Sequence, residues 1–234
     1  MGLFSFVSDA ISTVGSFVSG ALSTVGSFLS NTAGSILSGI GKCIPVIREI
    51  SIAVQIVAHA VKVIGEIFKE VFQKEVDMEE IGAKIRQDGT RPQMEGETAE
   101  EYLNYLTNDV ELDKEKHEKT SIEDKLVNMA TGLSLVSDSL NEKLGVNITG
   151  EFLMTIGKLK LEHDFVDHLI KNFALQDLKN TDRFVSYLKN DLVDTEKTQM
   201  ANIVKTTLLD VDSNLSEREI QNKIYDMKYE FNKP

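Results

Sequence analysis

An eleven-residue repeat that is almost free of charge opens this chain, and it limits what the chain can fold into. The segment Ser5–Gly41 reads SFVSDAISTVG SFVSGALSTVG SFLSNTAGSILSGIG. Its first two copies match at nine of eleven positions, and a third copy, which begins at Ser27, is shifted. Eleven residues make three helical turns at about 3.67 residues per turn. Equivalent residues of the copies therefore return to nearly the same face of a predicted helix.

The large apolar residues of the repeat step mostly by three and four, which is typical of an amphipathic helix. The opposite face carries Ser, Thr and Gly, and the only charge in the first 41 residues is Asp9. The glycines make a lone helix unfavourable in water, whereas small residues allow close packing against another helix or within lipid. The residues that we expect to insert into a membrane are Phe6, Val7, Ile11, Val14, Phe17, Val18, Leu22, Val25, Phe28 and Leu29.

A second apolar segment runs from Val46 to about Phe72, after a break at residues 39–45 that contains Pro45. Nineteen helical residues, 50–68, would span about 29 Å, which is sufficient for a bilayer core. Gln55, His59 and Lys62 form one narrow polar stripe, which either faces solvent or another domain, or lines a pore. Residues 1–75 are therefore predicted to form a hydrophobic helical hairpin.

Charge divides the chain in two. Residues 1–75 carry as many acidic as basic groups, so the whole formal net charge of −12 lies in residues 76–234. This acidity argues against nucleic-acid binding, and it removes attraction to anionic lipid as a driving force. The single Cys43 excludes an internal disulfide, and the apolar N-terminus lacks the basic start of a Sec signal. We expect synthesis in the cytoplasm, followed by secretion through a specialised system or by membrane association.

Residues 76–96 are predicted to be a connector, with a polar linker at residues 86–96 and a short helix or hairpin extension before it. Residues 97–234 are predicted to be an acidic domain of five to seven amphipathic helices. Capping boxes are expected at Thr98 with Glu101, Thr120 with Glu123, and Ser216 with Glu219. Thr149 and Thr195 are expected to begin helices, and Gly145 to end one. No alternating strand pattern competes, so the predicted fold class is all-α.

Residues that could carry chemistry are few. The segment Glu162–His168 is the one group of metal-ligand types, but its histidines are five apart, whereas a zinc-binding helix spaces them by four. Charge pairs on a helix surface explain it better. No phosphate-binding loop, nucleophile motif or carboxylate pair is present, and we predict neither an enzyme nor a cofactor or metal site.

A hydrophobic hairpin in front of a soluble helical domain resembles the general plan of helical pore-forming bacterial toxins and secreted effectors. The resemblance covers about the first 75 residues, and it implies a lipid bilayer as target, a homo-oligomer when inserted, and an immunity protein or chaperone as partner. One alternative is a structural or interaction protein whose N-terminal helix packs inside a larger assembly, such as a phage particle or injection apparatus. The other is a self-contained soluble helical protein in which the repeat is a central helix.

Overall fold

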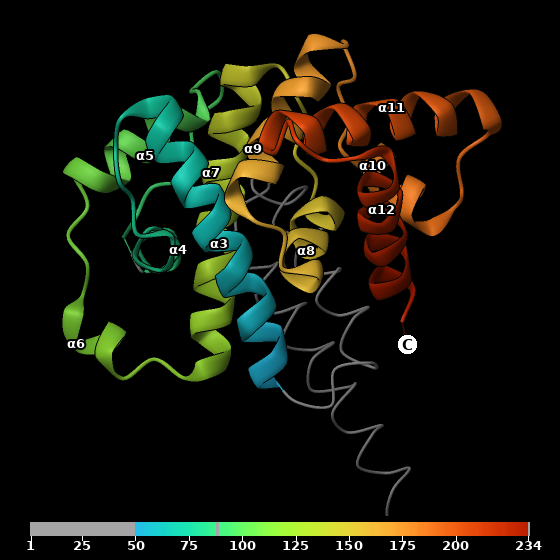
Figure 1. The fold of residues 1–234 in the computed structure, drawn as a ribbon. Helices are drawn as coiled ribbons and strands as arrows, with labels where there is room; N and C mark the ends of the chain where they lie inside the picture. Colours follow the sequence, from blue (N-terminus) through green and yellow to red (C-terminus); the bar gives the residue numbers. More distant parts are fainter. Residues whose placement is uncertain (1–49, 88, 234) are drawn as a thin grey trace, which may run out of the picture.

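The computed structural model describes residues 50–87 and 89–233, which form a group of packed helices (Figure 1). They are α3 (Ile50–Phe72), α4 (Met78–Arg86), α5 (Ala99–Asn108), α6 (Lys114–Glu118), α7 (Ile122–Leu144), α8 (Gly150–Leu159), α9 (His163–Leu175), α10 (Asp182–Lys189), α11 (Asp194–Val211) and α12 (Glu217–Asn232). Across these ranges there is no strand, and a single isolated bridge joins Asn147 to Asn180. The predicted all-α class is confirmed for this part of the chain. The repeat, and with it the first arm of the predicted hairpin, lies outside the described residues.

The long helix α7 lies at the centre of one half of the molecule. Its residues are buried without interruption from Leu126 to Ser137, and α3, α4 and α5 pack around it. Burial on all sides explains why the apolar pattern of α7 is less one-sided than that of a surface helix. In this half, three helices therefore cover a fourth.

The crossing of α4 and α7 is set by two glycines. A Cβ atom at Gly82 would lie 1.9 Å from the Asn128 carbonyl oxygen, and one at Gly132 would lie 1.9 Å from the Met78 carbonyl oxygen. Only glycine allows backbones to approach this closely. The two glycines thus fix the position of α4, and with it the position of Arg86 at its C-terminal end.

The second half of the molecule is built from α8 to α12, and α3 joins it to the first. One face of α3 contacts α7, and α3 also packs against α8 and α9. Its buried residues belong to the common core, and they are Ala53, Val57, Ala60, Val63, Ile64, Ile67 and Phe68. In the part of the chain that the structure describes, no helix has both the length and the apolarity that crossing a bilayer requires.

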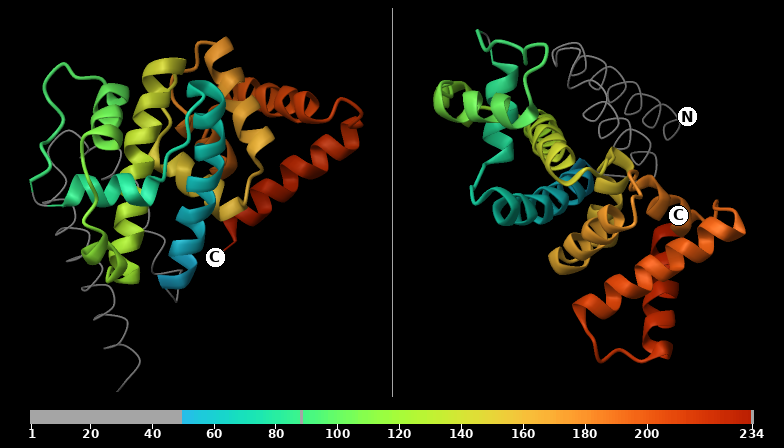
Figure 2. Two further views of the ribbon diagram at one scale, coloured as in Figure 1. Left: turned by 90° about the vertical axis from the view of Figure 1, so that its left-hand side faces the viewer. Right: turned by 90° about the horizontal axis from the view of Figure 1, so that it is seen from above.

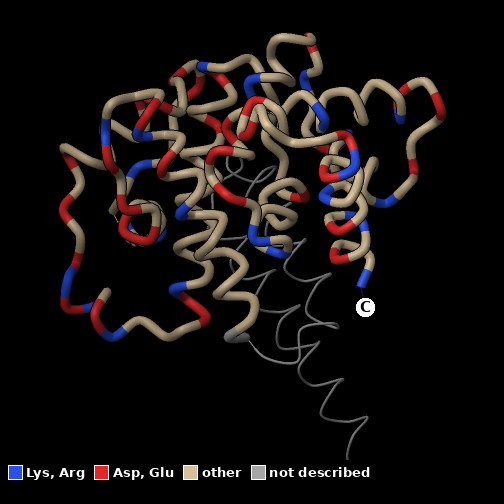
Figure 3. Tube along the Cα trace, viewed as in Figure 1, with Lys and Arg blue, Asp and Glu red and all other residues tan. Residues whose placement is uncertain are grey.

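The remaining helices lie toward two opposite ends of the molecule. Helix α11 packs on α9, and α12 packs on α10 and α8. The two views of Figure 2 place α6 and the start of α7 at one end, and α11 with α12 at the other. Acidic and basic residues alternate along α6 and its flanking loops, whereas the central helices carry few charges (Figure 3).

Helix starts agree with the sequence at some positions and differ at others. The capping boxes at Thr98 and Ser216 are confirmed, as are the Thr149 cap and the left-handed Gly145 at the end of α7. The predicted box at Thr120 is wrong, because Ser121 caps α7 and accepts a hydrogen bond from the Asp124 backbone N–H. Helix α11 begins at Asp194 rather than at Thr195. Residues 97–233 hold the eight helices α5 to α12, which is more than the predicted five to seven.

Candidate functional site

The three residues of the predicted polar stripe do not share one environment. Gln55 and Lys62 are exposed, whereas His59 is partly buried, with its Nε2 atom 2.9 Å from the Leu161 carbonyl oxygen. His59 therefore connects α3 to the loop before α9. A role of the stripe in lining a pore stays a prediction. All ten repeat residues expected to insert, and also Asp9 and Cys43, lie outside the described residues.

The segment 162–168 engages in charge pairs. His163 Nδ1 is 3.0 Å from Asp164 Oδ1, and His163 Nε2 is 3.3 Å from Glu70 Oε1 on α3, close enough for an ion pair but without hydrogen-bond geometry. Asp167 pairs with Lys171 one helical turn later. Within residues 50–87 and 89–233, no three His, Cys, Asp or Glu side chains gather in a way that could hold a metal ion.

The best candidate for a binding site is a cavity of about 450 Å³ between α4, α6 and the first turn of α7. We call it the α4–α6–α7 cavity. Its size falls in the range of small-molecule sites, about 300–1,000 Å³. Its charged and polar lining consists of Arg86, Gln87, Asp113, Lys116, His117, Lys119, Thr120, Ser121, Asp124 and Asn128.

Arg86 is held in a fixed position at the cavity wall. Its Nη1 atom donates to Asn128 Oδ1 at 2.6 Å and to the Asp124 carbonyl at 3.2 Å, and its Nη2 atom donates to Asp124 Oδ1 at 2.9 Å. The hydrogen bond from Arg86 is the main reason why the pKa of Asp124 lies below its usual value. The carboxylate of Asp124 also accepts a hydrogen bond from the Ser121 hydroxyl at 2.9 Å. Asp124 is therefore ionised and already satisfied by the protein.

Gln87 and His117 complete the inner part of the lining. The Gln87 side chain donates to the Glu111 carbonyl at 2.8 Å and accepts from the Asp113 backbone N–H at 3.2 Å, so it holds the loop in front of α6. His117 Nε2 lies 3.8 Å from Glu79 Oε1 on α4. The Nδ1 atom of His117 and the Nε atom of Arg86 are both buried, and neither has a hydrogen-bond partner in the described part of the chain.

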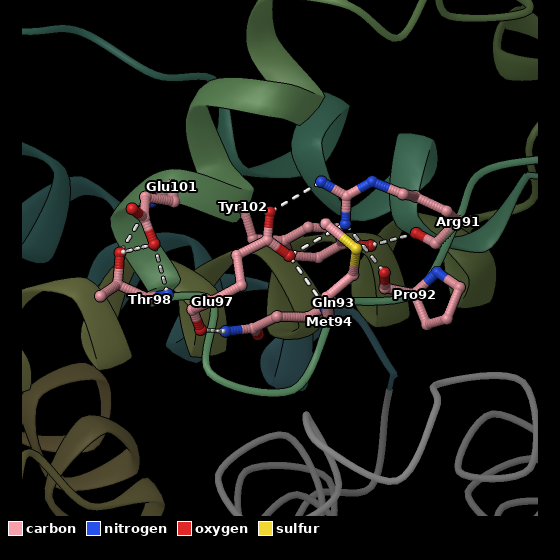
Figure 4. A network of polar contacts seen from close by, with 8 residues as sticks. All are labelled: Arg91, Pro92, Gln93, Met94, Glu97, Thr98, Glu101 and Tyr102. Carbon is pink, nitrogen blue, oxygen red and sulfur yellow. Dashed lines mark hydrogen bonds and ion pairs between the residues drawn. The ribbon is translucent and has the colours of Figure 1, made fainter.

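A second polar network, next to the cavity in the sequence, has a structural role instead. Arg91 donates to both carboxylate oxygens of Glu97, at 2.9 and 2.7 Å (Figure 4). Its guanidinium also lies 4.0 Å from the ring centroid of Tyr105. The Tyr102 hydroxyl donates to the Arg91 carbonyl at 2.9 Å, and burial raises the pKa of Tyr102 to about 12. The hydrogen bond from Arg91 lowers the pKa of Glu97. These groups satisfy one another and fold the predicted linker, while Thr90 Oγ1 and Gln93 Oε1 in the same segment are buried without a hydrogen-bond partner in the described residues.

No motif or periodicity in the sequence indicates that the cavity residues lie together. Arg86 lies at the start of the predicted linker, and the charged run at residues 113–119 is typical of an exposed turn or a frayed helix. Their meeting depends on the α4–α7 crossing, which is a tertiary feature. Comparison of the chain with protein-family models, with curated proteins and with solved structures found no match.

Proposed function

We propose that this chain is a membrane-inserting, pore-forming protein of the bacterial toxin or secreted-effector kind, and that the inserting unit is the N-terminal repeat. The observation that carries the proposal is the repeat itself, which presents large apolar residues on one predicted face and has Asp9 as its only charge over 41 residues. A soluble helix of about 37 residues rarely keeps its polar face free of Lys and Glu. Lipid on one side, with small hydroxyl residues that line an oligomeric lumen or pack helix to helix on the other, accounts for both faces.

The arrangement of α3 favours an inserting unit that ends before residue 50. The apolar face of α3 is buried against α7 and α8, so its insertion would require the core of the helical domain to open. A repeat that inserts while residues 50–233 stay folded avoids that cost. In this proposal the acidic helical domain keeps the protein soluble before insertion, and it is the part that an immunity protein or a chaperone would bind.

Dye release from liposomes by full-length protein tests the proposal. We expect release by the wild type, and its loss in the double variant Phe17→Asp with Val18→Asp. A charged residue in the bilayer centre costs about 2.5–3.5 kcal/mol on insertion scales, so two of them oppose insertion strongly. The matched control is Ser16→Asp with Ser23→Asp, which adds the same charge to the hydroxyl face of the predicted helix.

The results of this experiment show whether lipid or protein covers the apolar face of the repeat. Leakage that survives the Phe17 and Val18 changes would show that the repeat does not insert as proposed. No release by wild-type protein over a range of pH would favour the alternative function, in which the repeat packs inside a larger assembly. A fragment that begins at residue 76 is not a suitable negative control for dye release, because it lacks α3 and therefore uncovers the surfaces of α7 and α8 on which α3 packs.

A further inference from the structure

The central helix α7 carries a face of small residues with unpaired hydroxyl groups. We call it the α7 small-residue face, and it consists of Ala130, Thr131, Ser134 and Ser137. These residues recur at the three- and four-residue spacing of one helix side, and all four are fully buried. Small side chains allow another helix to approach closely. The face is therefore suited to contact with a further helix.

The face points away from α4. At about 100° per residue, Ser134 lies roughly 160° around α7 from Gly132, which contacts the α4 backbone. Leu133 marks the side between them, where the apolar face of α3 finds large apolar partners. Helix α5 is positioned by the hydrogen bond from the Ala99 N–H to Glu142, which lies beyond the C-terminal end of the face. The α7 small-residue face thus differs in direction from the sites where these described helices are anchored.

Three hydroxyl groups on this face lack partners. The Oγ1 atom of Thr131 and the Oγ atoms of Ser134 and Ser137 are buried, and none has a hydrogen-bond partner in the described residues. Ser139, seven residues from Gly132 and so on the α4 side, differs because its hydroxyl donates to a carbonyl of its own helix at 3.1 Å. Buried polar atoms are nearly always paired. A neighbour with hydroxyl groups of its own would supply partners, since a hydroxyl both donates and accepts.

We propose that one copy of the N-terminal repeat packs on the α7 small-residue face and is stored there before insertion. The storage role rests on the proposed function, whereas the docking itself does not. Each of the first two copies carries three Ser and one Thr. Eleven helical residues span about 16 Å, which is enough to cover residues 130–137, about 11 Å long. Residues 1–49 lead directly into α3, which packs on α7.

Two further properties of the repeat fit this face. The face has no charged residue, and burial of an unpaired charge is costly, so it requires an uncharged helix. The second copy of the repeat, residues 16–26, carries no charge at all. Its Thr24 is seven residues from Phe17, about 20° around the predicted helix, so this hydroxyl lies at the border of the apolar face. Docking by this border would pair hydroxyls and also cover part of the apolar face.

Disulfide formation between paired cysteines tests the docking in full-length protein. All variants carry Cys43→Ser, so the introduced thiols are the only ones. Two cysteines bond only when their Cα atoms lie within about 7 Å. We expect mild oxidation to join Ser134→Cys, within one chain, to Thr13→Cys or Thr24→Cys, which are equivalent residues of two copies. Ser139→Cys is the matched control, because it is a buried serine of the same helix on the α4 side, and it should bond to neither.

Non-reducing electrophoresis and mass spectrometry identify the products, and circular dichroism checks that each variant is folded. Absence of an intrachain disulfide at both repeat positions would overturn the docking. A disulfide between two chains would also overturn it, in favour of a second copy as the occupant. Equal disulfide formation by the Ser139→Cys control would overturn the assignment to this face.

Labelling of a single thiol in the presence of liposomes tests the storage role. In the Cys43→Ser background, Ser134→Cys should resist a maleimide reagent in buffer and lose this protection when liposomes are added, because insertion removes the repeat. Ser139→Cys should stay protected in both conditions. Labelling of folded Ser134→Cys in buffer would overturn the docking, whereas protection that persists while dye is released would overturn only the storage role. Absence of dye release would contradict the proposed function, and the disulfide experiment would still decide the docking.

Discussion

Replacement of Gly157 by Ala tests whether α3 is fixed to the helical domain. Gly157 lies on α8, and a Cβ atom there would be 2.1 Å from the Ile56 carbonyl oxygen on α3, whereas real Cβ atoms essentially never come closer than 3.0 Å. Helices α3 and α8 would have to separate by almost an ångström. The clash is with backbone, so no side-chain rotation relieves it.

The magnitude follows from two opposing effects. Alanine is favoured over glycine inside a helix by about 1 kcal/mol. Overpacking a close contact costs about 1–3 kcal/mol, and a rigid backbone neighbour places this case at the upper end. We expect Gly157→Ala to lower the free energy of unfolding by about 2 kcal/mol.

Urea unfolding followed by circular dichroism measures this change, and Gly65→Ala is the matched control. Gly65 lies on α3 itself, and its nearest foreign atom would be the flexible Met78 Cε at 3.6 Å, which is an ordinary contact. The control should be as stable as the wild type, or more stable by up to about 1 kcal/mol. Equal stability of Gly157→Ala and Gly65→Ala would refute the packing of α3 on α8.

The same pair of variants also tests which segment inserts. Five large side chains of α3 are fully buried, and at about 1.5–3 kcal/mol each, release of the helix would cost roughly 8–15 kcal/mol. That is comparable to the whole stability of a typical domain, about 5–15 kcal/mol. If α3 stays in place, both variants should release dye from liposomes at the wild-type rate. A faster rate in Gly157→Ala alone would show that α3 leaves the domain during insertion.

Three further predictions concern the helical domain. Asp124→Asn should make the free energy of unfolding less dependent on pH in acid. The pKa of Asp124 is lowered in the folded protein, so its carboxylate stabilises the fold above about pH 4, and this stabilisation is lost as the pH falls. Urea unfolding midpoints of the variant and the wild type at several pH values measure the difference. Glu97→Gln should make residues 89–98 more sensitive to limited proteolysis, because Arg91 loses its two-oxygen partner, and an unchanged cleavage pattern would contradict this. Gly145→Ala should cost about 1–2 kcal/mol in urea unfolding, since its φ of 68° is left-handed while no neighbour lies within 4 Å, and Gly145→Asn should cost less.

Helix class and several helix ends could be predicted because they depend on neighbours in the chain. The boxes at Thr98 and Ser216 need only a partner three residues on, and the structure confirms both. The first residue of α7 could not be predicted from its neighbours in the chain alone. Thr120 with Glu123 and Ser121 with Asp124 have the same spacing, and Arg86, from another helix, holds Asp124 in the second arrangement.

The environment of α3 and the α4–α6–α7 cavity could not be predicted, for a different reason. An apolar helix face has the same pattern whether lipid or protein covers it, and the structure covers α3 with α7, α8 and α9. The cavity combines residues of α4, α6 and α7, whose placement depends on the close crossing at Gly82 and Gly132 and on the Gln87 contacts that hold the loop before α6. Such a crossing leaves no periodic signal in the sequence.

The hydrogen bond between His59 and Leu161 joins residues 102 positions apart, and this separation has a consequence for biosynthesis. Helix α3 leaves the ribosome long before α8, which covers it, has been made. At about 5–20 residues per second, roughly 5–20 seconds pass in which the apolar face of α3 is uncovered on the nascent chain. The repeat emerges even earlier. A factor that shelters these two apolar segments would therefore have to act during translation.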